Sequence, residues 1–111
     1  MDFKQLATSE TAICVIKDPR TGQDTDIQIE LYGVHTKHFR AMSAQFAGKD
    51  DNEGFLAALT KSWQGIEDGD KPLDFSEENA KRVYSEVPVI AGQVDQFIVR
   101  QSNFLPKASK G

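Results

Sequence analysis

The stretch 63–79 constrains the fold more than any other part of the chain, because it forces one element to end and another to begin. Gly65 and Gly69 allow the positive φ angles at which a helix stops, and Pro72 cannot continue a helix. Ser76 is typical of a helix N-cap, since its hydroxyl can accept a hydrogen bond from a free amide of the next turn. The pattern therefore predicts a helix that ends near Gly65, a turn-rich connector and a new helix after Ser76.

Four segments with helical periodicity surround this connector. Before it, we expect helices with apolar stripes formed by Phe39, Met42 and Phe46, and by Phe55, Leu56, Leu59 and Trp63. After it, the stripes are Ala80, Val83, Tyr84 and Val87, and then Ile90, Val94, Phe97, Ile98 and Gln101. Pro88 either stops or kinks the third helix or opens the fourth, because proline is tolerated in a first helical turn.

The N-terminal third has a period of two instead. Residues 11–17 are rich in apolar and β-branched side chains, which predicts a strand buried on both faces. Residues 24–32 alternate between apolar and polar side chains. We expect Ile27, Ile29 and Leu31 to face the core, and Asp26, Gln28 and Glu30 to face water. Pro19 and Gly22 lie between the two segments and predict the turn of an antiparallel hairpin.

These elements predict an α+β fold in one domain of 111 residues. Two strands alone are marginally stable, so the hairpin at 11–32 should pack on a bundle of three or four helices within 36–101. Residues 1–10 should form a short arm or a helical turn, and residues 102–111 an aperiodic tail.

Composition argues against several classes of function. With 39% hydrophobic and 27% charged residues, the chain is neither disordered nor fibrous. Its 13 basic and 17 acidic residues give a net charge of −4, and the basic residues form no stripe, which disfavours nucleic-acid binding. The sequence also lacks a long apolar run and a secretory signal, so we expect a cytoplasmic protein that does not bind membranes.

The cysteine and the histidines offer little chemistry. Cys14 lies inside an apolar run and predicts a buried, inert thiol. His35 and His38 are three residues apart and could reach one metal ion, but a zinc site usually needs a third protein ligand. Solvated or capping histidines explain the pair more simply.

Three aspartates in the connector, Asp68, Asp70 and Asp74, form the other candidate metal site. A calcium loop of the EF-hand type needs glycine at its sixth position and glutamate at its twelfth, where this chain has Leu73 and Asn79. Turn-forming aspartates therefore explain the cluster. We expect no catalytic, cofactor-binding or metal-binding residue, and no enzymatic activity.

Apolar side chains near residue 100 are the remaining candidates for a binding surface. The stripe that contains Phe97 continues toward Phe104 and Leu105, where little sequence remains to cover them. Either a partner covers these side chains, or the tail folds back and buries them. We take Phe97, Phe104 and Leu105 as the candidate partner-binding residues.

The connector resembles the central signature of tail assembly chaperones from long-tailed bacteriophages and prophages. The resemblance rests on Trp63, Gly65, Ile66, Asp68, Gly69, Pro72, Leu73, Phe75, Ser76, Glu78 and Asn79, and further on Phe97, Ile98, Asn103 and Phe104. The first half of the chain matches this family only in outline.

The resemblance implies a small cytoplasmic protein that is not an enzyme. Such a chaperone binds the tape measure protein, keeps its apolar helices soluble and assists tail tube assembly, with the major tail protein as a further partner. Self-association is compatible with this role, and no cofactor is implied. The competing hypothesis is a structural tail or head–tail joining protein of a prophage particle.

Overall fold

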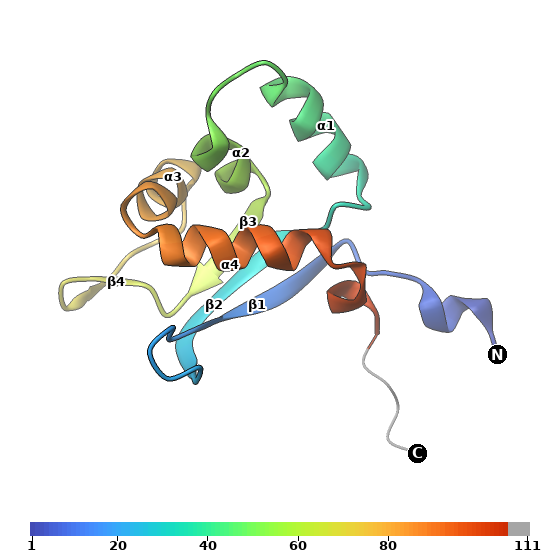
Figure 1. Cartoon of the computed structure of the whole chain (residues 1–111), viewed down its shortest axis with the longest axis horizontal. Helices are drawn as coiled ribbons and strands as arrows, with labels where there is room; N and C mark the ends of the chain where they lie inside the picture. The colour runs from blue at the N-terminus through green and yellow to red at the C-terminus, as the bar shows by residue number, and fades with distance from the viewer. Residues whose placement is uncertain (107–111) are drawn as a thin grey trace.

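A three-stranded antiparallel sheet with helices on one face forms the centre of the molecule (Figure 1). The computed structural model describes residues 1–106. β1 (Thr11–Lys17) and β2 (Asp24–Tyr32) form the expected hairpin, and β3 (Thr60–Gln64) pairs with the other side of β2. The α+β class and the N-terminal antiparallel hairpin are confirmed.

One face of the sheet is buried and the other is open. Cys14, Ile29 and Leu31 lie under the helices in the core, as the alternation of β2 predicted. Ile13 points to the opposite face, where its exposed fraction is 50%. The prediction that both faces of residues 11–17 are buried is therefore wrong, because the helices that cover the sheet lie on the side of Cys14.

Two helices follow the hairpin, and each has a side-chain cap. α1 (Lys37–Phe46) begins after Thr36, whose hydroxyl accepts a hydrogen bond from the Phe39 amide. α2 (Asn52–Ala58) begins after Asp51, whose carboxylate accepts from the Gly54 amide. α1 packs against α2, and most of its length lies away from the sheet (Figure 1).

The structure corrects the prediction of a helix that runs to Gly65. α2 ends at Ala58, and β3 begins two residues later, so Trp63 lies in a strand. The range 36–101, which was expected to hold only helices and turns, therefore also contains a strand of the main sheet. The free edge of β2 explains the difference. Its Tyr32 amide donates to the Leu59 carbonyl, and its Glu30 carboxylate accepts from the Ser62 hydroxyl. Pairing with β2 outweighs the helical spacing of the apolar residues.

The connector contains a second, smaller hairpin, formed by β4 (Glu67–Asp68) and β5 (Lys71–Pro72). α3 (Glu77–Glu86) then begins after Ser76, whose hydroxyl accepts from the Asn79 amide at 3.0 Å, as the sequence predicts. α4 (Pro88–Val99) has proline at its first position, which decides between the two roles proposed for Pro88.

Short 3₁₀ helices lie at both ends of the described chain. η1 (Phe3–Leu6) is the expected N-terminal turn and projects away from the sheet (Figure 1). η2 (Gln101–Phe104) replaces part of the aperiodic tail predicted for 102–111. Leu105 and Pro106 are irregular as predicted, and 107–111 lies outside the described residues. None of the described helices is long and apolar enough to cross a membrane.

Candidate functional site

The residues of 63–79 that carry the resemblance, which we call the signature, hold the connector together. The Trp63 indole Nε1 donates a hydrogen bond to the Leu73 carbonyl at 2.8 Å, and its ring meets Phe75 edge to face, with centroids 5.2 Å apart. The Asn79 side-chain amide donates to the Asp74 carbonyl at 2.9 Å. These contacts fasten the connector to β3 at one end and to α3 at the other.

Gly65 places the connector directly against β2. Its φ is +87°, and a Cβ at this position would overlap with the carbonyl oxygen of Asp26. Gly69 also has a positive φ, +73°, but it lies in the turn between β4 and β5 with open space around it. The predicted positive φ angles are present, although Gly65 ends a strand and not a helix.

An apolar groove lies where the connector meets β2 and the junction of α3 and α4. Its volume is about 190 Å³. We call it the α3–α4 groove, and its apolar lining residues are Ile27, Ile66, Leu73, Val83, Val87 and Ile90. Ile66 and Leu73 belong to the signature, so two of the residues that carry the resemblance form a wall of this groove.

A charged rim borders the α3–α4 groove. The Arg82 guanidinium contacts the Asp68 carboxylate at 3.0 Å and the Glu86 carboxylate at 3.2 Å. Hydrogen bonds with these two carboxylates raise the pKa of Arg82. Asp68 therefore has a cationic side chain as its partner. Within residues 1–106, no three His, Cys, Asp or Glu side chains lie close enough together to hold a metal ion.

The expected partner-binding residues do not form one surface. Phe104 is only 1% exposed and packs between the rings of His35 and Phe97, at centroid distances of 5.2 and 5.5 Å. Phe97 is half-buried against the core, and Leu105 is exposed. Of the two alternatives for Phe104, the structure shows the second: the chain folds back at η2, where the Phe104 carbonyl accepts from the Ser9 amide at 2.7 Å. Phe104 is therefore not available as a partner-binding residue.

The two histidines use their rings for backbone contacts in different places. Nε2 of His35 lies 2.8 Å from the Ser9 carbonyl, and Nε2 of His38 lies 2.7 Å from the Ala58 carbonyl. The His38 ring also packs on Tyr32, with centroids 4.0 Å apart. Cys14 is buried beneath the helices, and burial raises its pKa to about 11, which disfavours the reactive thiolate at neutral pH.

Comparison with known proteins gives no identification: no family model, curated protein or solved structure matches the chain. We take the α3–α4 groove as the candidate site because its lining is largely apolar and because Ile66 and Leu73 form part of its wall. Sequence reasoning singled out Ile66 and Leu73 but missed the groove itself. Ile27 and Val87 come from separate elements, and only the pairing of β3 with β2 brings the connector beside them.

Proposed function

We propose that this protein is a tail assembly chaperone, not an enzyme, that binds an apolar helical segment of a tape measure protein in the α3–α4 groove. One observation supports the proposal most: residues that carry the resemblance also build the groove. Ile66 and Leu73 line it, and Asp68 holds the Arg82 side chain at its rim.

The apolar lining and the small volume of the groove suit one or two side chains of an amphipathic or apolar helix. Such a helix binds by inserting a few apolar side chains, spaced three or four residues apart, into a hydrophobic groove. Val87, at the junction of α3 and α4, is 40% exposed and extends the apolar lining to the surface. The ion pairs of Arg82 then form a polar rim, as is common around the apolar centre of a protein interface.

Co-expression with a tape measure protein tests the proposal. Val87→Lys places a charge in the groove, and Val99→Lys is the matched control, because Val99 is 59% exposed on α4 and does not line the groove. We expect the tape measure protein to stay soluble with the wild type and with Val99→Lys, and to precipitate with Val87→Lys. Thermal unfolding of both variants checks that the charges leave the fold intact.

Two results would contradict the proposal. If both variants keep the tape measure protein soluble, the α3–α4 groove is not the binding surface. If only Val99→Lys fails, the partner binds at the end of α4, near Phe97 and Leu105.

Purified particles provide a separate test of the class of protein, because a chaperone is absent from them whereas a structural tail or head–tail joining protein is present in many copies.

A further inference from the structure

β1 has an outer edge whose backbone groups are free over five residues. It is an edge strand, since the order of the sheet is β1-β2-β3. Hydrogen-bonding direction alternates along an antiparallel strand, and the Glu10 carbonyl accepts from the Gly33 amide of the β2 side. Thr11, Ile13 and Val15 therefore direct their backbone N–H and C=O groups outward. No hydrogen bond from elsewhere in residues 1–106 reaches them there.

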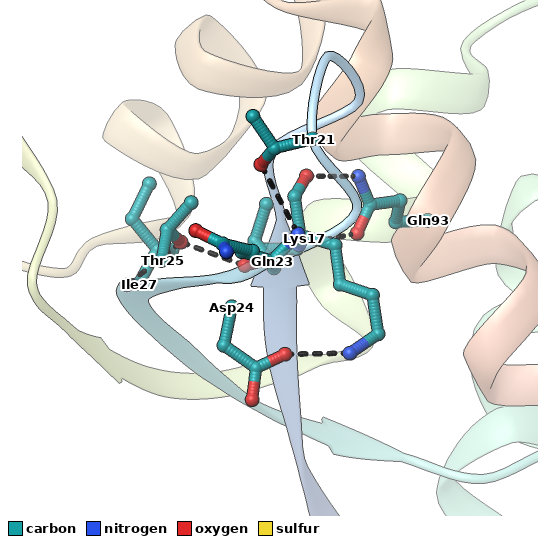
Figure 2. A network of polar contacts seen from close by, with 8 residues as sticks. Lys17, Thr21, Gln23, Asp24, Thr25, Ile27 and Gln93 are labelled. Atoms are coloured by element: carbon teal, nitrogen blue, oxygen red, sulfur yellow. Dashed lines mark hydrogen bonds and ion pairs between the residues drawn. The ribbon is translucent and has the colours of Figure 1, made fainter.

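Both ends of this edge are closed by groups from the C-terminal part of the chain. Figure 2 shows Gln93 of α4, whose side-chain oxygen accepts from the Lys17 amide and whose side-chain nitrogen donates to the Lys17 carbonyl, each at 2.8 Å. At the other end, the Ser9 amide donates to the Phe104 carbonyl. The carboxamide of Gln93 thus takes the place of a neighbouring strand at Lys17, and only residues 11–15 remain open.

The open stretch lacks the features that usually prevent edge pairing. Natural edge strands are protected by charged residues, proline or bulges, yet residues 11–15 read Thr-Ala-Ile-Cys-Val. The irregularity of β1 between Val15 and Lys17, and the charge of Lys17, lie just beyond this stretch. The half-exposed Ile13 lies at the middle of the stretch. On the opposite edge of the sheet, β3 carries Lys61 and is followed by the connector. The two edges therefore differ, and the β1 edge is the one suited to receive a strand.

We propose that two copies of the chain pair through residues 11–15 of β1, antiparallel and about a two-fold axis at Ile13. Each Ile13 then lies opposite its counterpart, and Thr11 lies opposite Val15. The three outward N–H and C=O pairs of each copy are satisfied by the other, and the two exposed Ile13 side chains cover one another. The product is one continuous sheet of six strands, with helices on one face.

The N-terminal arm favours a second copy over a strand from another protein. Phe3 and Leu6 are 79% and 59% exposed on an arm that enters β1 from outside the sheet. In the two-fold arrangement, each arm passes the partner copy beside its Lys17. A groove of about 320 Å³ lies there, between β1 and α4, with Val15, Gln93 and Phe97 among its lining residues. One chain thus supplies both the free strand edge and the apolar arm that the pair would cover.

Two measurements on the purified full-length chain test this pairing without any tape measure protein, so the result is separate from that for the α3–α4 groove. Analytical ultracentrifugation over a wide concentration range should show a species of twice the chain mass. Amide exchange in the concentrated sample should protect the outward N–H groups of Thr11, Ile13 and Val15. Dilution should remove this protection while leaving Ala12 and Cys14, which pair with β2, protected.

Ile13→Pro is the direct variant, because it removes an outward N–H and leaves the hydrogen bonds to β2 in place. We expect it to raise the dimer dissociation constant at least tenfold, whereas Ile13→Thr, which keeps the N–H, should retain the dimer with weaker affinity. Circular dichroism and thermal unfolding check that both variants fold. A wild type that stays monomeric, a dimer with rapidly exchanging amides at 11, 13 and 15, or a folded Ile13→Pro variant that dimerises normally would overturn the proposal.

Discussion

At the scale of single residues, the buried hydroxyls of Thr60 and Tyr84 form an ordered chain of hydrogen bonds. Thr60 Oγ1 donates its only hydrogen to the Leu56 carbonyl at 2.9 Å. The Tyr84 hydroxyl lies 2.7 Å from Thr60 Oγ1. It must be the donor in the bond between these two hydroxyls, because Thr60 has no second hydrogen to give. This pair joins α3 to the end of α2 and the start of β3, the point at which the chain leaves the predicted helix.

The order of donors predicts unequal effects of removing either hydroxyl. Thr60→Val leaves the Tyr84 hydroxyl buried without an acceptor and should lower the free energy of unfolding by about 1–3 kcal/mol. Tyr84→Phe leaves Thr60 bonded to Leu56 and should cost only about 0.5–1.5 kcal/mol. Urea unfolding at pH 7 measures both values, and a larger loss for Tyr84→Phe would show that the donor order is reversed.

The buried phenol also predicts a dependence of stability on alkaline pH. Burial raises the pKa of Tyr84 from 10.0 to about 12, so the folded protein keeps a proton that the unfolded chain releases. This contribution is complete below pH 10 and is lost as the pH rises from 10 through 12, by at most about 3 kcal/mol. In urea unfolding, the advantage of the wild type over Tyr84→Phe should shrink between pH 9.5 and 11.5; a constant difference would contradict this.

At the scale of elements, the connector depends on how closely Gly65 approaches β2. Gly69→Ala should lower the free energy of unfolding by about 1–2 kcal/mol, the cost of a left-handed conformation in a residue with a Cβ. Gly65→Ala adds a clash with the Asp26 carbonyl to the same cost and should lower it by more than about 3 kcal/mol. Comparing the two variants by denaturant unfolding isolates the clash, and equal losses would show that the connector can move away from β2.

The elements that the sequence predicts correctly are those with local causes. Ser76 caps α3 through its own next turn, and Pro88 opens α4 because of its fixed φ. β3 was missed because the residues that make it a strand lie in β2, 32 positions away for Ser62 and Glu30. The choice between a partner-covered and a folded-back Phe104 stays open in the sequence for the same reason, since its cover comes from His35 and from the backbone of Ser9. The candidate site depends on such distant contacts, so only its signature residues could be named in advance.

At the scale of the whole molecule, the two proposed surfaces lie on different parts of the fold. The α3–α4 groove lies between the connector and the helix junction, and the free edge of β1 lies beside the opposite end of α4, near η2 (Figure 1). A pair formed through β1 would therefore leave the α3–α4 groove of each copy open. Such a pair could hold two segments of one long apolar helix, or of two neighbouring ones, at the same time.

The contact between Gln93 and Lys17 also affects how the protein folds during its synthesis on the ribosome. These residues are 76 positions apart along the chain, and α4 covers strands that were synthesised first. The hairpin therefore leaves the exit tunnel with its apolar face uncovered and cannot acquire its final cover until α4 has also left the tunnel. Folding of the sheet must then wait for α4 and proceed through contacts of large sequence separation, which form slowly.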